Sequence, residues 1–294
     1  MKMKKNLCVV ELKGGFGNQL FQYGFAYKLR TKGFRVKVSN AFFTTKETNL
    51  NVTPREEILP SKVFGFNQIT IIEKWLLKFL KKINDSKKVK LLFPFLIEAF
   101  YKYYKEKDLT SFNISQPISH FDGYWQNYDY IDSSKDYLTS SLSKNKLIRE
   151  ALKIKKIKGS TLVHVRRQDY LSLNEELNIN YYELAIKEAT RLIEDFNFSI
   201  FTDDPKWVSK NEIFKYANFV YFPKNSRQSS QDTIETFSKM LQFENFIIAN
   251  SSFSYMAAFL GSGLHSKIFY PNPWFKNRES KNLSLNNWIK IQNY

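Results

Sequence analysis

The chain contains a single cysteine, Cys8, among its 294 residues. One cysteine cannot close an intramolecular disulfide, which excludes the small disulfide-stapled secreted folds and indicates a reducing compartment. No apolar run approaches the length of a membrane-spanning helix, and the run after residues 1–6 is too short for a secretion signal. We therefore expect a cytoplasmic protein, long enough for two modest domains that each bury a core.

The usual phosphate-binding fingerprints are also missing. A strand expected over residues 7–12 leads into a glycine-rich turn at Gly14 and Gly15. The turn does not read G-x-G-x-x-G, and it lacks the G-K-S/T ending of a P-loop. Glycines between a strand and a helix nevertheless permit positive φ and let the backbone approach a ligand closely.

Basic side chains stand where a buried strand is expected to end. Residues 161–165 are mostly apolar, and the strand leads through His164 to Arg166 and Arg167. Open α/β sheets bind their ligands outside the carboxyl ends of the strands, and a guanidinium fork suits a phosphate. Two neighbouring arginines can equally be a solvated surface pair, so this motif alone decides nothing.

Two further strands end in polar residues. The run over residues 198–202 leads to Asp203 and Asp204, whose carboxylates could accept hydrogen bonds from a guanine; before Pro205 either could instead cap a helix. A strand over residues 246–250 runs into a serine-rich helix start, where free backbone N–H groups and hydroxyls can hold a phosphate. The coincidence of a basic, an acidic and a donor-rich strand end favours a binding site.

Taken together, these segments resemble the α-1,2-fucosyltransferases of glycosyltransferase family 11. The similarity rests on five motifs in family order: GGFGNQLFQY at 14–23, GYWQ at 123–126, HVRRQDY at 164–170, TDD at 202–204 and IIANSSFS at 247–254. It implies an α/β protein of the GT-B class, with two Rossmann-like domains facing a cleft. The second domain would hold most of the donor, GDP-fucose.

The resemblance also implies roles for individual residues. Arg166 and Arg167 would meet the pyrophosphate, and Asn18 would reach the donor from across the cleft; these three form the expected catalytic set. The expected donor-binding residues are Gly14, Gly15, His164, Asp203, Asp204, Asn250, Ser251, Ser252, Phe253 and Ser254. The sequence departs from the family pattern at Gln168, where glycine is usual, and at Tyr255 and Met256, where a tryptophan pair is usual.

Acceptor binding is expected in the first domain. Tyr124, Trp125 and Gln126 offer stacking rings and an amide, which suit a galactose-containing oligosaccharide, although aromatic clusters more often belong to a core. We place this acceptor-side domain at residues 1–157, and the donor-binding domain with its C-terminal tail at residues 158–294.

A net charge of +17 indicates an anionic partner. Much of the charge lies in an amphipathic insertion near residues 71–107, where Trp75 and Phe79 alternate with Lys78 and Lys82 at helical spacing. This segment could pack on the first domain, contact the inner face of an anionic membrane, or do both. No nucleic-acid-binding motif accompanies the charge.

The expected reaction is inverting transfer of L-fucose from GDP-β-L-fucose to the 2-hydroxyl of a galactoside, in a pathway such as lipopolysaccharide O-antigen synthesis. Arginines would stabilise the departing diphosphate, so we expect neither a cofactor nor a divalent metal. Two alternatives remain open: a metal-dependent glycosyltransferase that uses Asp203 and Asp204, and a non-catalytic glycan or polyanion binder.

Overall fold

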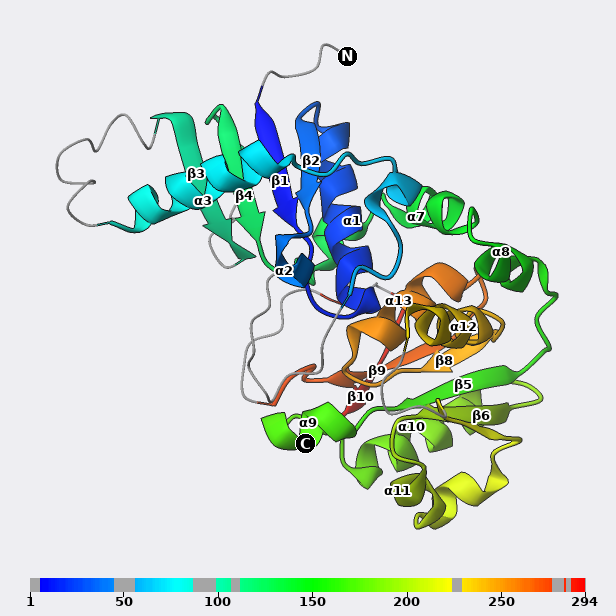
Figure 1. Cartoon of the computed structure of the whole chain (residues 1–294). Helices are drawn as coiled ribbons and strands as arrows, with labels where there is room; N and C mark the ends of the chain where they lie inside the picture. Colours follow the sequence, from blue (N-terminus) through cyan, green and yellow to red (C-terminus); the bar gives the residue numbers. More distant parts are fainter. Residues whose placement is uncertain are drawn as a thin grey trace. The chain divides into compact units, whose positions relative to one another are not determined.

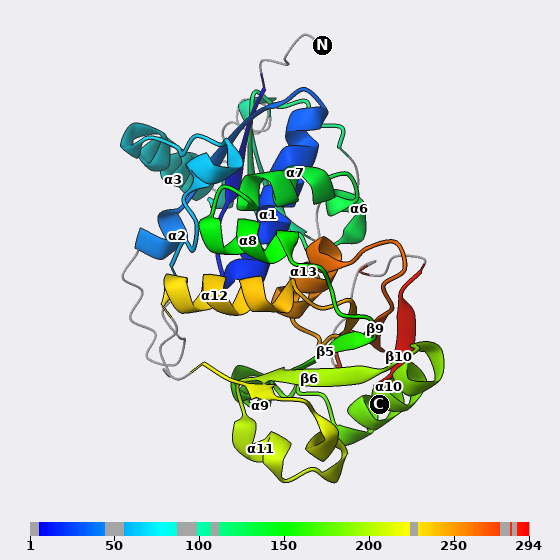
Figure 2. The same cartoon turned by 90° about the vertical axis from the view of Figure 1, so that its right-hand side faces the viewer.

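The chain folds into two compact α/β units, residues 1–141 and residues 142–294. This computed structural model describes residues 6–44, 56–86, 99–106, 112–223, 229–276, 283 and 287–293. Each unit is built around its own parallel sheet (Figures 1 and 2). The two sheets confirm the α/β class and the pair of Rossmann-like domains that the sequence predicted.

The first unit contains a four-stranded parallel sheet in the order β2-β1-β4-β3. Its strands are β1 (Leu7–Glu11), β2 (Arg35–Ser39), β3 (Tyr101–Lys105) and β4 (Ile118–Asp122). The central strand β1 is buried from Leu7 to Val10, as its continuous apolar run predicts. All four strands end at the same edge because they run in the same direction.

Helices cover both faces of this sheet. They are α1 (Phe16–Thr31), α2 (Ala41–Thr44), the 3₁₀ helix η1 (Ser61–Phe64), α3 (Ile71–Asp85), α6 (Tyr128–Ile131) and α7 (Lys135–Leu142). On one face, Phe25 of α1 meets Phe121 of β4 with ring centroids 5.4 Å apart. On the other face, Leu77 of α3 packs in a cluster with Val9 and Tyr101. Side chains of a strand alternate between faces, so Glu11 and Val9 share the α3 side.

The second unit contains a six-stranded parallel sheet in the order β10-β9-β8-β5-β6-β7. Its strands are β5 (Ser160–Val165), β6 (Asn197–Thr202), β7 (Val220–Tyr221), β8 (Asn245–Ile247), β9 (Ile268–Asn272) and β10 (Ile289–Gln292). The C-terminal strand β10 pairs with β9 in parallel and closes one edge. The strands β8, β5 and β6, which the sequence predicted to end in donor-rich, basic and acidic residues, are therefore neighbours in the sheet.

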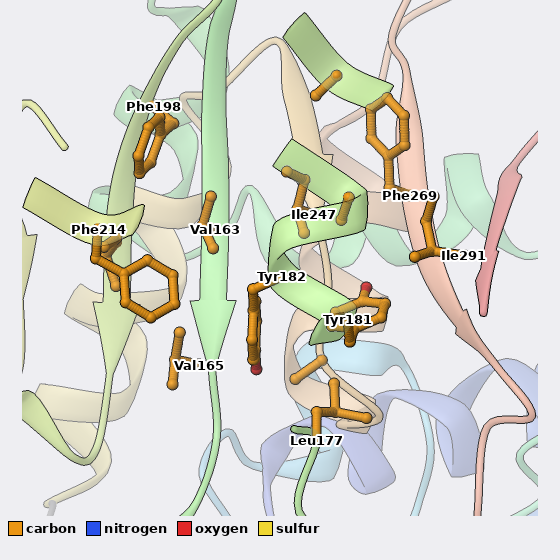
Figure 3. Close-up of a cluster of buried hydrophobic side chains, with 14 of the residues drawn as sticks. Val163, Val165, Leu177, Tyr181, Tyr182, Phe198, Phe214, Ile247, Phe269 and Ile291 are labelled. Carbon is orange, nitrogen blue, oxygen red and sulfur yellow. The ribbon is translucent and has the colours of Figure 1, made fainter. Parts of the chain in front are cut away.

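Helices also flank the second sheet. They are α8 (Lys146–Lys153), α9 (Gln168–Leu173), α10 (Ile179–Leu192), α11 (Pro205–Ser209), the 3₁₀ helix η3 (Glu212–Tyr216), α12 (Ser230–Met240) and α13 (Ser252–Gly261). Figure 3 shows Tyr181 and Tyr182 of α10 packed beside Val163 and Val165 of β5, within one buried cluster. Val163 and Val165 thus face α10, which leaves His164 for the opposite face.

The structure changes two details of the expected organisation. The boundary between the units lies after Ser141, ahead of the predicted position at residue 157, because α8 packs on α12 of the second unit. The predicted insertion near residues 71–107 contains α3 but also β3, which is an integral strand of the first sheet. Residues 87–98 and 107 of that segment lie outside the described residues. Among the described helices, none has the length and apolarity that crossing a bilayer requires.

Candidate functional site

Polar side chains of the second unit gather where β8, β5 and β6 end. The three strands are parallel neighbours, with Val163 of β5 in register with Ile247 of β8 and Ile200 of β6. Their carboxyl ends therefore meet at one edge, where an open α/β sheet presents its ligand. The basic, acidic and serine-rich segments predicted from the sequence are brought together there.

Arg166 lies at the centre of this edge. Its Nε and Nη2 atoms donate to the two carboxylate oxygens of Asp169 at 2.8 and 2.9 Å, and Nη1 lies 3.2 Å from Asp203 Oδ2. Burial opposes the charge, but Asp203 and Asp169 outweigh it and raise the pKa of the guanidinium. Arg166 is thus held in a fixed orientation, and a guanidinium has five N–H donors, so some remain for a ligand. Asp169 has a positioning role here.

Arg167 points away from this centre. Its guanidinium carbon lies 4.2 Å from the ring centroid of Trp207 on α11, and Nε lies 3.4 Å from Asp204 Oδ2. It lines a cavity of about 310 Å³ together with Glu176, Leu177, Asn178, Ile179, Trp207, Asn211 and Lys276, residues at the α10 and α11 side. Arg166 and Arg167 thus have different surroundings in this structure: Arg166 pairs with Asp169 and Asp203, and Arg167 packs on Trp207 near Asp204.

Asp203 and Asp204 stabilise the backbone around the carboxyl ends of β5 and β6. Asp204 is the N-cap of α11 and accepts a hydrogen bond from the Trp207 backbone N–H. Asp203 accepts from the backbone N–H groups of Arg167 and Gln168 at 2.8 and 3.3 Å, and Gln168 Nε2 donates to the Asp203 carbonyl. Asp204 therefore takes the helix-capping role that the sequence left open for either aspartate, and Asp203 anchors the loop after β5. The unusual Gln168 tightens the same loop.

His164 is buried on β5, facing Phe253 of α13 with ring centroids 6.5 Å apart. Within the described residues, its Nδ1 atom has no hydrogen-bond partner. Burial and, secondly, the positive charge of Arg166 lower the pKa of His164 from its ordinary 6.5 to about 3. The ring is therefore neutral near pH 7 and carries an unsatisfied polar atom, which a bound ligand could satisfy.

The lowered pKa of His164 leads us to expect that the free energy of unfolding depends on pH. Between pH 6.5 and pH 3, His164 is largely protonated in the unfolded chain and largely neutral in the folded chain. The free energy of unfolding must therefore fall as pH drops through this window, with this group contributing up to about 1.4 kcal/mol per pH unit. Urea unfolding of the wild type and of His164→Asn at pH 7 and pH 5 measures the effect. Equal losses in the two proteins would contradict it.

The start of α13 supplies further donors. Ser251 is the N-cap, and its Oγ accepts from the Phe253 N–H. The first turn of a helix leaves backbone N–H groups without intrahelical acceptors and carries a partial positive charge, which suits an anion. Ser252 and Phe253 lie half-buried at this end, whereas Ser254 is fully buried and donates to backbone carbonyls. Only the first part of the predicted serine cradle can therefore meet a ligand.

Asn250, which precedes the N-cap Ser251, is buried. Its Nδ2 donates to the Glu175 carbonyl, while Oδ1 has no hydrogen-bond partner among the residues that the structure describes. The Tyr170 hydroxyl donates to the Asn250 carbonyl and so ties α9 to the start of α13. Arg166, His164 and Asn250 are in this way connected through α9 and α13.

In the first unit, the turn between β1 and α1 is held by two buried glutamines. Gln19 Nε2 donates to the Gly14 carbonyl, and Gln22 accepts from the Lys13 N–H while donating to the Gly123 carbonyl. Gly14 has φ of +76°, and Gly15 is the N-cap of α1. Asn18 lies in the first turn of α1, where its Oδ1 accepts from Gln126 Nε2 at 2.6 Å.

Gly14 has no room for a side chain. A Cβ there would lie 2.6 Å from Asn18 Nδ2 and 2.9 Å from the Tyr124 ring. We expect Gly14→Ala to lower the free energy of unfolding by about 1–2 kcal/mol, because alanine is strained at positive φ, and to reduce turnover by displacing Asn18. Urea unfolding and initial rates test this. Gly263→Ala is the control, since its Cβ would meet nothing within 4 Å; equal stability of the two variants would contradict the prediction.

The predicted acceptor residues separate into exposed and buried groups. Tyr124 is exposed, with Lys13 Nζ 5.1 Å from its ring centroid, and the backbone N–H of Gln126 donates to Glu106. Trp125 is fully buried with its ring stacked 4.2 Å from Phe25. Its ring therefore belongs to the core and leaves no face for a sugar, whereas Tyr124 and Gln126 stay accessible beside Asn18.

Sequence reasoning missed a cluster on the α3 face of the first sheet. His120 lies between Glu11, 3.0 Å from Nε2, and the Tyr101 hydroxyl, 3.3 Å from Nδ1. Asp122 pairs with Lys13 at 2.5 Å and accepts from the Tyr103 hydroxyl. A carboxylate that orients an imidazole is a common acid–base arrangement. In the sequence this cluster was marked only by polar residues at the ends of two apolar strands. That Glu11 and His120 meet follows from the register of β1 with β4.

The site in the second unit is thus a preorganised cation beside an open helix N-terminus and a neutral buried histidine. Such a strand edge binds an anionic group and stabilises charge that develops on it. In the described part of the chain, no three His, Cys, Asp or Glu side chains come together as a metal ion would need. These features define an α/β protein of two parallel-sheet units, and the second unit has a strand edge whose side chains suit an anionic group.

The chain belongs to glycosyl transferase family 11, whose family model matches residues 7–292. It is therefore a glycosyltransferase. It is 27% identical over 315 residues to an alpha-1,2-colitosyltransferase of Escherichia coli, covering 98% of this chain and 99% of that protein. It is 26% identical over 303 residues to the O-antigen biosynthesis glycosyltransferase WbnK of Escherichia coli, covering 95% and 99%.

One solved structure with a similar chain path is the alpha-1,6-fucosyltransferase NodZ soaked with GDP-fucose, an enzyme from Bradyrhizobium. The identity is 15% and the TM-score 0.45, over 87% of this chain and 93% of the other.

Proposed function

We propose that this glycosyltransferase moves L-fucose from GDP-β-L-fucose to the 2-hydroxyl of a galactoside in a surface glycan. The observation that carries the proposal is Arg166, fixed by Asp169 and Asp203 beside the α13 N-terminus. Family membership supports the reaction type, and one relative is named for α-1,2 transfer and another for O-antigen biosynthesis. GT-B domains facing a cleft, with Asn18 reaching the donor, are part of this proposal.

In the proposed step the acceptor oxygen forms a bond to the anomeric carbon while the bond from that carbon to the β-phosphate oxygen breaks. The electron pair leaves with GDP, and the proton of the acceptor hydroxyl passes to solvent water as the new glycosidic bond forms. Negative charge grows on the β-phosphate, so Arg166 stabilises the transition state more than the bound donor. Arg166 and the N–H groups of α13 would provide this stabilisation, and we propose that no divalent metal is required.

Purified protein incubated with GDP-fucose and a panel of galactosides tests the proposal. GDP release should rise with the galactoside, mass spectrometry should detect a product one fucose heavier, and NMR should locate the new linkage at O2. Activity should persist in EDTA. Loss of activity in EDTA would support the metal-dependent alternative, and donor binding without any turnover would support the non-catalytic one.

A second donor is favoured by one relative, which is named for colitose. Colitose differs from L-fucose in lacking the 3-hydroxyl, so the two donors share their leaving group and differ at one sugar position. Competition between GDP-fucose and GDP-colitose for the same acceptor identifies the preferred sugar. A preference for GDP-colitose would change the donor sugar and leave the role of Arg166 intact.

The proposal also includes a location. Acceptors for surface glycans are presented at membranes when they are carried on lipids, and a net charge of +17 favours an anionic surface. We propose that the enzyme works as a peripheral protein at such a surface.

A further inference from the structure

Helix α3 presents two apolar faces, and only one of them is packed. Leu77 is buried against Leu7, Val9 and Tyr101 of the first sheet, with Leu80 partly buried beside it. The opposite side carries five large apolar residues with high exposed fractions: Ile71 74%, Ile72 80%, Trp75 70%, Leu76 43% and Phe79 60%. We call these five the α3 stripe. Figure 1 shows α3 lying along the face of its sheet.

The stripe stands on a helix that is already formed. Thr70 and Glu73 make a reciprocal capping box at the N-terminus, and Glu73 pairs with Lys37 of β2 at 2.5 Å. The helix is therefore fixed to its sheet through Leu77 and Lys37, and its outer face is preorganised. Contiguous exposed apolar surface of this kind is rare on soluble monomers. Apolar side chains that a preformed helix holds exposed to water indicate that another surface binds there.

Charges beside the stripe indicate the chemistry of that partner. Lys78 and Lys82 are exposed and follow Trp75 at helical spacing, so they border the stripe. Lys78, Lys81 and Lys82 also line an open hollow of about 430 Å³ with Asp85 and Ser86. Aromatic and aliphatic anchors flanked by lysines are the pattern of helices that lie in the interface of an anionic bilayer. A second copy of this chain fits less well, because lysines would face lysines in a protein of net charge +17.

We propose that the α3 stripe, with Lys78 and Lys82, docks this enzyme flat on an anionic lipid bilayer. The apolar side chains would enter the headgroup boundary, and the lysines would contact lipid phosphates. A helix of fifteen residues is about 22 Å long, enough to lie along the surface and too short to cross it. The inference extends the proposed function by naming the surface, but vesicle binding needs neither donor nor acceptor, so each can fail without the other.

The experiment measures binding of the full chain to vesicles by flotation and by tryptophan fluorescence. Of the five tryptophans, Trp125, Trp274 and Trp288 are buried and Trp207 is half-buried, so a blue shift on binding reports mainly Trp75. Binding and a blue shift are expected with vesicles of phosphatidylglycerol and phosphatidylethanolamine, and much weaker binding with neutral phosphatidylcholine. Trp75→Phe should keep the binding and lose most of the shift.

Two pairs of variants separate the apolar and the ionic contributions. Trp75→Ser with Phe79→Ser should weaken binding at least tenfold, whereas Leu184→Ser with Leu264→Ser, also exposed, should leave it unchanged. Lys78→Gln with Lys82→Gln should weaken binding to anionic vesicles by about fivefold per lysine, and Lys153→Gln with Lys155→Gln should have little effect. All four should keep wild-type turnover of a soluble galactoside.

Three results would overturn the proposal. The first is absence of vesicle binding, and the second is equal binding to anionic and neutral vesicles. The third is binding that survives the Trp75 and Phe79 substitutions. Light scattering that shows these substitutions converting a dimer into a monomer, without vesicle binding, would assign the stripe to self-association instead.

Discussion

Replacing Arg166 with alanine is expected to lower kcat by about two to three orders of magnitude while the protein stays folded. The guanidinium is oriented by Asp169 and Asp203 before any ligand arrives, so its charge requires no reorganisation as GDP leaves. Alanine removes the charge and leaves the two carboxylates without their shared cation. Initial rates of GDP release at saturating donor and acceptor measure the loss, and thermal unfolding monitors the fold.

Arg191→Ala is a matched control for this variant. Arg191 also pairs with a carboxylate three residues away in the chain, Glu188, but on the exposed side of α10. It should keep wild-type kcat. Arg167→Ala should lower stability more than kcat, because its guanidinium packs on Trp207. An Arg166→Ala enzyme with wild-type kcat would remove Arg166 from the mechanism.

Asp203→Asn is expected to raise the donor KM and to lower kcat at least tenfold, with a loss of about 2 kcal/mol in the free energy of unfolding. Both carboxylate oxygens of Asp203 face donors: Oδ1 faces the Arg167 N–H, and Oδ2 faces the Gln168 N–H and Arg166 Nη1. An amide has only one acceptor oxygen, so its NH₂ group would oppose a donor. The loop that carries both arginines would then lose its anchor. Steady-state kinetics and urea unfolding measure both effects.

Asp204→Asn should behave differently. Asparagine caps a helix about as well as aspartate, so the hydrogen bond from the Trp207 N–H would remain. Only the ion pair with Arg167 at 3.4 Å is lost, and we expect near wild-type stability and a small change in KM. Equal defects in the two asparagine variants would show that the two aspartates share one role.

Much of the candidate site in the second unit could be predicted, because the strands of a parallel sheet end at the same edge. His164 and Arg166 lie at the end of one buried strand, and Asn250 follows another strand about 85 positions further along the chain. Strands that run the same way end at the same edge, so the sequence predicted that these residues meet. The assignment of single side chains was harder, because Arg167 and Ser254 turn toward neighbouring protein groups that no local pattern specifies.

In the first unit, too, the surroundings of single side chains could not be predicted from local sequence. From its motif, Trp125 was expected to offer its ring to a sugar, but in the structure the ring is buried and stacked on Phe25. The pairing of Glu11 with His120 depends on β1 and β4 being adjacent, although 109 positions separate the two residues. The periodicity of α3 predicted an amphipathic helix, and only its packing on Tyr101 and Val9 identified the face that stays exposed.

The sequence by itself determined the α/β class, the two domains, the family motifs and the strand ends that carry the polar groups, because these follow from local periodicity and chain order. The tertiary structure alone decided which arginine is centred, which aspartate anchors and which caps, and which aromatic rings are buried. Those outcomes depend on contacts between residues distant in the chain, where the partner of a side chain is set by strand register and helix packing.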